Sequence, residues 1–132
     1  MKLLLLGTAR ERSSRVKNKM TRPFAGSSLY EVYLKKFETI TKREHPFDNI
    51  GMAINRNDKI LWEMSENTKV PIIERNDESV TGIRKRSEEL HFLEDMEEDY
   101  VMWVNGCLPF LKPETIIKAA TFFKSANGDI KS

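Results

Sequence analysis

Four short apolar segments alternate along the chain with segments whose apolar residues recur every three or four positions. Each apolar segment is too short for a helix and is typical of a buried strand, whereas the segments between them have the spacing of amphipathic helices. The expected strands are Leu3–Thr8, Asn49–Asn55, Val70–Ile73 and Tyr100–Val104. This alternation predicts an α/β fold, with a Rossmann-like parallel sheet, right-handed crossovers and helices on both faces.

The expected helices follow the strands in order. They cover residues 27–43, 58–64, 80–93 and 113–127, and the first three begin near Ser or Asp residues that favour helix N-termini. Pro113 suits the first turn of the last helix, and Asn127 with Gly128 forms its expected C-terminal cap. The polar, aperiodic segment Ala9–Phe24 is expected to be a loop.

The composition bounds the class of protein. A chain of 132 residues, 39% apolar and 32% charged, is expected to form a single domain over residues 1–132. The net charge of +2 gives no signal for a nucleic-acid or membrane partner, and the apolar run Leu3–Leu6 is too short to span a membrane. The single cysteine, Cys107, excludes an intrachain disulfide and favours a reducing, cytoplasmic setting.

Ligands of parallel α/β sheets bind outside the carboxyl ends of the strands, which directs attention to the loop after the first strand. From Met1 to Arg22 there are seven basic side chains and one acid, Glu11. Arg and Lys bind phosphate groups, so this loop is a candidate triphosphate site. It contains neither a Walker motif nor a dinucleotide-binding glycine pattern, and its composition fits a solvated basic loop equally well.

The spacing A-R-x-x-S-x-R-φ-x-x-K, followed by R-P-φ-A-G, resembles the signature loop of the acylneuraminate cytidylyltransferase family, the CMP-sialic acid synthetase-like enzymes. The resemblance implies that Arg10, Ser13, Arg15 and Lys19 bind the nucleotide and that Arg10 and Lys19 are catalytic. Glu11 and Arg12 stand where the family usually has glycine, and Asn18 precedes the lysine rather than following it.

Two weaker matches extend the resemblance along the chain. Asn105, at the end of the fourth strand, falls where the family has Gln or Asn, and its amide could read a base or ribose edge. Arg75 follows the third strand and is a second candidate nucleotide contact. The structural alternatives are an Asn105 that caps its own turn and a surface Arg75 paired with Glu74 or Asp77. Asn55 is interpreted as structural.

The resemblance implies a reaction in which a hydroxyl of an acidic sugar attacks the α-phosphate of CTP, giving a CMP-sugar and pyrophosphate. It also implies Mg²⁺, although no metal-ligand set is found in the sequence, and a homodimer. The family's domain is longer than this chain, so we expect the N-terminal part of a nucleotide-diphospho-sugar transferase fold. The alternatives are a non-catalytic nucleotide-binding module, a related polysaccharide-biosynthesis nucleotidyltransferase, and a glycosyltransferase, which would normally carry an Asp-x-Asp that this sequence lacks.

Overall fold

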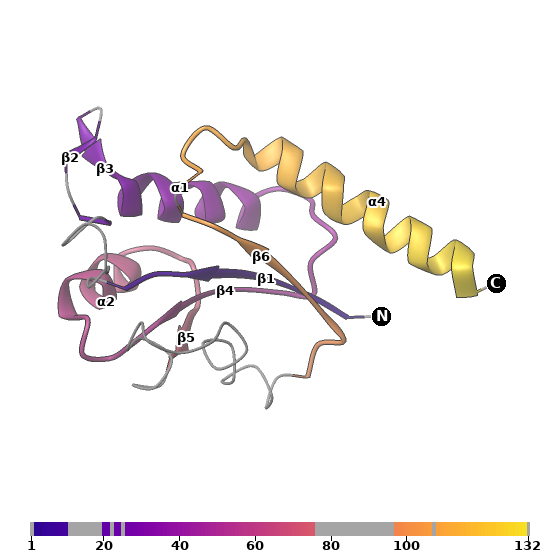
Figure 1. Cartoon of the computed structure of the whole chain (residues 1–132), viewed down its shortest axis with the longest axis horizontal. Helices are drawn as coiled ribbons and strands as arrows, with labels where there is room; N and C mark the ends of the chain where they lie inside the picture. Colours follow the sequence, from indigo (N-terminus) through magenta and orange to yellow (C-terminus); the bar gives the residue numbers. More distant parts are fainter. Residues whose placement is uncertain are drawn as a thin grey trace.

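The computed structural model describes residues 2–10, 20–21, 23–24, 26–75, 97–106 and 108–131. Its centre is a sheet of four parallel strands, in the order β5-β4-β1-β6 (Figure 1). The strands are β1 (Leu3–Thr8), β4 (Asn49–Ile54), β5 (Ile72–Glu74) and β6 (Tyr100–Val104). The predicted parallel α/β sheet is therefore confirmed, and the bounds of β1 and β6 are those that the sequence predicts.

Strand β1 is the central element of the described sheet. It pairs with β4 from Leu4↔Asn49 to Thr8↔Ala53 and with β6 from Leu3↔Tyr100 to Gly7↔Val104. Its leucines are buried on both faces of the sheet, with exposed fractions of 2% or less. A continuous apolar run is what a parallel strand covered on both faces requires.

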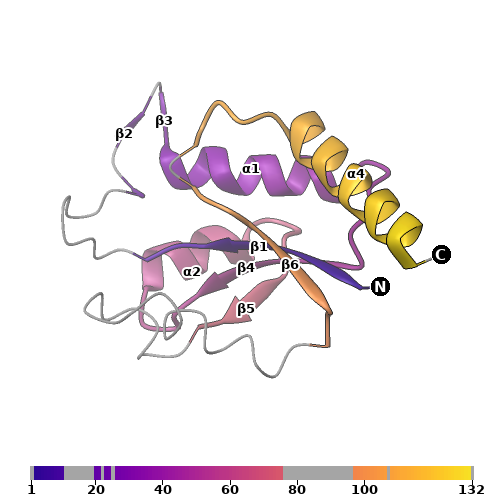
Figure 2. The ribbon, with the colours of Figure 1, turned by 45° about the vertical axis from the view of Figure 1, so that its right-hand side comes forward.

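The three described helices share one face of the sheet. They are α1 (Leu29–Thr41), α2 (Lys59–Glu66) and α4 (Pro113–Lys131). Leu3 and Leu5 of β1 belong to the same hydrophobic cluster as Phe37 of α1, Leu61 of α2 and Ile116 of α4. Figures 1 and 2 show α1 and α4 over the same side of the sheet. The predicted helix over residues 80–93 lies outside the described residues.

The opposite face of the sheet has its own smaller cluster of buried residues. Leu4 and Leu6 of β1 pack there with Ala53 of β4, and Trp103 of β6 lies against them. The Trp103 indole Nε1 donates to Thr8 Oγ1 at 2.9 Å. This hydrogen bond fixes the side chain of the last β1 residue on the face that the described helices do not cover.

Helix α1 is held by its apolar stripe and by its first turn. Tyr30, Tyr33, Phe37 and Ile40 are buried at helical spacing, and each such side chain contributes about 1.5–3 kcal/mol of burial. Of the two serines at the predicted start of this helix, Ser27 and Ser28, the second is the N-cap, because its Oγ accepts from the backbone N–H of Glu31 at 3.2 Å.

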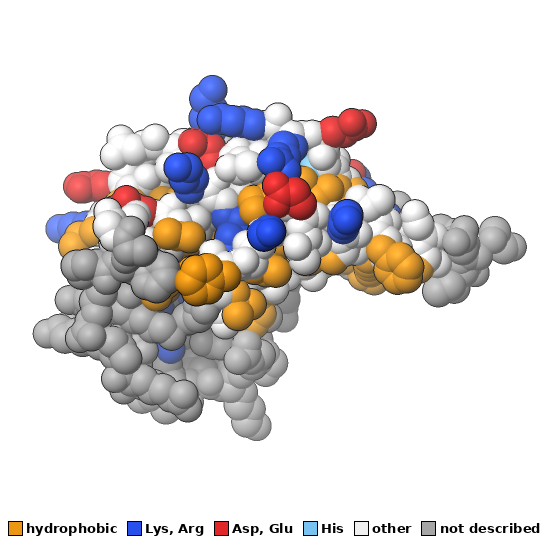
Figure 3. Space-filling view, turned by 90° about the horizontal axis from the view of Figure 1, so that it is seen from above, with side chains coloured by type: hydrophobic (Ala, Val, Ile, Leu, Met, Phe, Trp, Pro, Cys, Tyr) orange, Lys and Arg blue, Asp and Glu red, His pale blue; other side chains and the backbone are white. Residues whose placement is uncertain are grey.

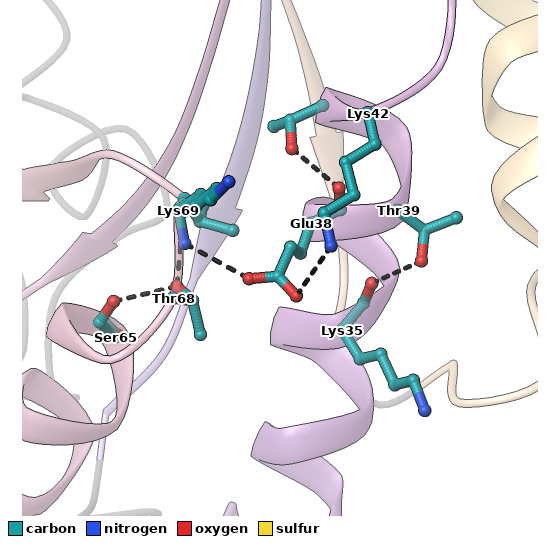
Figure 4. Close-up of polar contacts among 9 residues, drawn as sticks. Lys35, Glu38, Thr39, Lys42, Ser65, Thr68 and Lys69 are labelled. Carbon is teal, nitrogen blue, oxygen red and sulfur yellow. Dashed lines mark hydrogen bonds and ion pairs between the residues drawn. The ribbon is translucent and has the colours of Figure 1, made fainter.

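Glu38 of α1 connects this helix to the segment that follows α2. Its Oε2 accepts from the backbone N–H of Lys69 at 3.2 Å, and its Oε1 lies 3.7 Å from Lys42 Nζ (Figure 4). Thr68 shapes the same segment, because its hydroxyl donates to the Ser65 carbonyl at 2.8 Å and accepts from Val70 N–H at 3.2 Å. The chain entering β5 is thereby anchored on α1.

Besides shifts of one or two residues at other boundaries, the structure differs from the sequence prediction in the following elements. The segment expected to be a loop through Phe24 contains strand β2 (Pro23–Phe24), which pairs with β3 (Ser27–Ser28) in an antiparallel hairpin. Gly26 lies between them with φ 82°, a conformation that favours glycine. Strand β5 begins at Ile72 rather than Val70, and α4 continues through the predicted cap at Gly128 to Lys131. None of the described helices is long and apolar enough to cross a membrane.

Candidate functional site

The strand order creates a switch point beside β1. From β1 the chain moves outward to β4 and β5, and then returns to the other side of β1 to form β6. In open α/β sheets, ligands bind outside the carboxyl ends of the strands where the order reverses in this way. The switch point lies between the ends of β1 and β6, which places the candidate site beside Thr8 and Val104.

At the switch point the two strands part. The last pair between β1 and β6 is Gly7↔Val104, whereas β1 stays with β4 for longer, because Ala9 N–H donates to the Ala53 carbonyl at 3.2 Å. The hydroxyl of Tyr33 lies where the ladder between β1 and β6 ends. It accepts from Thr8 N–H at 3.0 Å and donates to the Val104 carbonyl. One side chain of α1 therefore bridges both strand ends.

Two glycines make room for Tyr33. A Cβ on Gly7 would lie 2.7 Å from the Tyr33 hydroxyl oxygen, and a Cβ on Gly106 would lie 2.6 Å from two carbons of the Tyr33 ring. These distances are well inside ordinary contact, since carbon atoms prefer to be about 3.5–4.0 Å apart. Only glycine at both positions lets the ring and hydroxyl reach the strand ends without displacement.

Arg10 and Asn105 lie on the two sides of the switch point. Arg10 follows the end of β1 and is partly exposed, while Asn105 follows the end of β6 and is exposed. The described chain leaves this edge of the sheet at Arg10 and resumes at Met20, whose Cε would lie 2.8 Å from a Cβ on Gly106. Ser13, Arg15 and Lys19, the other predicted ligands of the loop, lie outside the described residues.

The N-terminus of α1 also lies at this edge of the sheet (Figure 1), but its first N–H groups have protein acceptors. Tyr30 N–H donates to the Met20 carbonyl at 2.9 Å, and Glu31 N–H donates to Ser28 Oγ. An anion at the switch point would therefore depend on basic side chains rather than on these two amides.

Arg75 is placed at the carboxyl edge as predicted, but at its far end. Strand β5 is two strands from β1 and three from β6, so its backbone is roughly 10 and 14 Å from theirs. Arg75 is not the surface residue of the structural alternative, because it is only 4% exposed, and Glu74 pairs with Arg56 at 3.1 Å. Asp77, the other partner in that alternative, lies outside the described residues. The structure thus brings Arg10 and Asn105 to neighbouring strands and leaves Arg75 apart.

Asn55 makes hydrogen bonds that fit its interpretation as a structural residue. Its Nδ2 donates to the Arg75 carbonyl at 2.8 Å, and its Oδ1 accepts from Asn57 N–H at 2.9 Å. The first bond ties the end of β4 to the end of β5, and the second closes the turn into α2. Asn55 is buried, with an exposed fraction of 4%.

The loop after Asn105 is fixed to α1 by a buried lysine. Lys36 Nζ donates to the Leu108 carbonyl at 2.8 Å, and Leu108 N–H donates to the Asn105 carbonyl at 3.3 Å. Burial lowers the pKa of Lys36, because the charged ammonium loses its hydration. These contacts hold the turn that begins at Asn105 against the same helix that carries Tyr33.

The described residues offer no fit to the Mg²⁺ that the family resemblance implies. Across these residues, no group of three or more His, Cys, Asp or Glu side chains could hold a metal ion. On the face seen in Figure 3, acidic and basic side chains are interspersed rather than gathered by sign. We therefore assign none of the described residues to a metal-dependent reaction step.

Comparison with known proteins bears on the fold. No family model and no curated protein matches the sequence. Among solved structures, the chain resembles a CMP:2-keto-3-deoxy-manno-octonic acid synthetase complexed with CTP, at 14% identity and a TM-score of 0.69, covering 98% of this chain and 48% of that one. It also resembles a cytidylyltransferase from Leptospira borgpetersenii, at 16% identity and a TM-score of 0.69, covering 95% and 50%.

The fold is that of the nucleotide-diphospho-sugar transferases. A third similar structure is a Mycobacterium tuberculosis protein in complex with manganese, at 11% identity and a TM-score of 0.56, covering 89% of this chain and 57% of that one. The chain thus spans about half the length of these proteins. The structural similarity establishes the shared fold. At these sequence identities it leaves membership of the acylneuraminate family unconfirmed.

The sequence reasoning missed Tyr33. The residue falls within the predicted helix over residues 27–43 and is buried there, but the sequence assigns its hydroxyl no role. The available signal was a glycine at each of two strand ends, Gly7 and Gly106, close to the residues expected to bind ligand. Glycines there indicate that another group approaches the backbone closely.

Proposed function

We propose that this chain binds CTP at the carboxyl ends of β1 and β6 and serves in nucleotidyl transfer to an acidic sugar. The observation that carries the proposal is the position of the basic segment after β1. The strand order supports it, because Arg10, the first basic residue after β1, and Asn105 follow the ends of two neighbouring strands on either side of the switch point. The shared fold with a synthetase complexed with CTP supports the same nucleotide.

In the proposed reaction, a sugar hydroxyl oxygen forms a bond to the α-phosphorus of CTP. The bond from that phosphorus to the oxygen bridging to the β-phosphate breaks, and pyrophosphate leaves with that oxygen. The hydroxyl proton passes to solvent. Such a reaction depends mainly on holding the reactants in line and on neutralising the charge that develops on the leaving group.

Arg10 and the basic residues that follow it supply positive charge for this task. A guanidinium donates two parallel hydrogen bonds to a phosphate, and it remains charged at any physiological pH. In the proposal, Arg10, Arg15 and Lys19 hold and neutralise the phosphates, and the Ser13 hydroxyl donates to them. Asn105 contacts the nucleoside from the opposite side of the switch point, with Arg75 as a more distant candidate.

The second candidate function is nucleotide binding without turnover by this chain. It is favoured by one observation, that the chain spans about half the length of the solved structures it resembles. A related nucleotidyltransferase of polysaccharide biosynthesis, acting on a different sugar, remains a variant of the first proposal. Binding and turnover measurements separate these alternatives.

Isothermal titration with CTP, UTP, ATP and GTP, each with and without Mg²⁺, tests the proposed ligand. We expect CTP to bind most tightly and Arg10→Ala to weaken its binding about tenfold or more, since a hydrogen bond to a charged group contributes about 1.5–3 kcal/mol. Arg56→Ala is the matched control, because Arg56 is an exposed arginine at the same edge, paired with Glu74 on the β4–β5 side.

The outcomes distinguish the candidates. CTP binding together with CMP-sugar formation from an acidic sugar supports the transferase, and binding without pyrophosphate release supports the binding module. An absence of CTP binding, or an equal loss in Arg10→Ala and Arg56→Ala, contradicts the proposed site.

A further inference from the structure

The hydroxyl of Tyr33 forms hydrogen bonds to both strands of the switch point. It accepts from Thr8 N–H of β1 at 3.0 Å and donates to the carbonyl of Val104 of β6. The side chain is 1% exposed, so water does not compete for these bonds. One oxygen atom therefore bonds the backbone of both strand ends, on the face opposite the Trp103–Thr8 side-chain bond.

The position of that oxygen is itself fixed by packing. The ring of Tyr33 makes edge-to-face contacts with the rings of Tyr30, at 6.3 Å between centroids, and Phe37, at 5.3 Å. On its other sides the ring and hydroxyl lie so close to Gly106 and Gly7 that a methyl group at either glycine would collide with them. Tyr33 is thus confined between α1 and the two strand ends.

These contacts are one or two residues from the candidate ligands. Arg10 is the second residue after Thr8, and Asn105 is the residue after Val104. Resting on the proposed nucleotide site, we propose that Tyr33 is a positioning residue, which sets the distance between Arg10 and Asn105 and so shapes the site for the nucleotide. It does not touch the ligand in this proposal and acts through the backbone of β1 and β6.

A buried tyrosine hydroxyl can also serve stability alone, and Tyr30 provides the comparison. It lies on the same helix, is equally buried, and its hydroxyl shares a hydrogen bond of 2.6 Å with Ser65 Oγ. Ser65 belongs to α2 and retains its own bond to the Leu61 carbonyl at 2.8 Å. Removing the Tyr30 hydroxyl therefore deletes a buried hydrogen bond without changing how β1 and β6 are joined.

The test compares Tyr33→Phe with Tyr30→Phe in the full chain, by isothermal titration with CTP and by amide hydrogen exchange. Both variants keep the aromatic ring and both should lower the unfolding midpoint. We expect only Tyr33→Phe to weaken CTP binding, roughly tenfold, and to accelerate exchange of the Thr8 amide, while Tyr30→Phe stays within about twofold of the wild type. Sucrose is added to every sample, because it favours the folded state and keeps each variant folded.

Equal CTP affinities for the two variants, with wild-type binding intact, would overturn the role of Tyr33 and leave the nucleotide site standing. A wild-type chain that binds no CTP would instead overturn the proposed site, and the positioning role with it. An unchanged exchange rate at Thr8 in Tyr33→Phe would show that the hydroxyl does not hold the end of β1.

Discussion

Replacing Gly106 by alanine tests how firmly Tyr33 is held at the switch point. An alanine Cβ would lie 2.6 Å from two ring carbons of Tyr33 and 2.8 Å from Met20 Cε. Because carbon atoms prefer separations of about 3.5–4.0 Å, the neighbours must move by roughly 1 Å. The Met20 side chain can turn aside, but the Tyr33 ring can move only by disturbing the hydrogen bonds of its hydroxyl.

Two opposing effects set the size of the change. Forcing an extra methyl group into a filled core costs about 1–3 kcal/mol. Alanine also restricts the unfolded chain, which stabilises a protein by about 0.4–1 kcal/mol where the native backbone conformation suits it. Gly106 has no positive φ, so this second effect applies there. We expect Gly106→Ala to lower the free energy of unfolding by about 1–2 kcal/mol.

Urea denaturation followed by circular dichroism measures this loss. In a Tyr33→Leu background the ring is gone, so the cost of Gly106→Ala should fall by about 1 kcal/mol, as a coupling energy in a double-mutant cycle. Gly26→Ala is the control, because Gly26 has φ 82° and nothing within 4 Å of the added methyl group. Its cost comes from the backbone and should be the same in both backgrounds. An unchanged stability for Gly106→Ala, or an equal cost with and without the Tyr33 ring, would refute the reasoning.

Two further variants probe contacts that support the fold. Hydrogen bonds from Lys124 Nζ at 2.9 Å and Leu3 N–H at 2.7 Å lower the pKa of Asp48, so its stabilisation is present above the ordinary carboxyl range and is lost as the pH falls through the lowered pKa. Asp48→Asn should cost less than about 1 kcal/mol at neutral pH, because the pair is partly exposed, and should flatten the acid limb of stability against pH. An acid limb unchanged in the variant would contradict this origin. Ser28→Ala removes the acceptor of Glu31 N–H at the start of α1 and should cost about 1 kcal/mol in urea denaturation, and a neutral result would mean that the cap is dispensable.

The parallel sheet could be predicted because its local signals agree with one another. Leu3–Leu6 is apolar at every position, as a strand covered on both faces must be, and Tyr30 to Ile40 has the period of a helix with one buried face. The predicted start of β5 was wrong because a second constraint overrode the apolar pattern there. Pro71 has no N–H for the ladder and serves only as an acceptor, for Met52 N–H at 2.9 Å, so β5 begins after it rather than at Val70.

The site was less accessible to prediction than the sheet. The spacing of the basic residues and the position of Asn105 identified a carboxyl edge but could not order the strands along it. The separation of Arg75 from Arg10 follows from the order β5-β4-β1-β6, which depends on crossovers between residues far apart in sequence. The role proposed for Tyr33 depends on where its hydroxyl lies after α1 has packed. Gly7 and Gly106 signal a close approach to the backbone but not which side chain makes it.

The central place of β1 has a consequence for how the chain folds. Along the sequence β1 precedes both of its partners, because Leu4 pairs with Asn49 and Leu3 pairs with Tyr100. During synthesis β1 therefore lacks its second neighbour until Tyr100 has been added, and closing such long loops makes folding slow. During that interval the apolar segment Leu3–Leu6 lacks a pairing partner and favours aggregation. We therefore expect refolding yields to fall as the protein concentration rises.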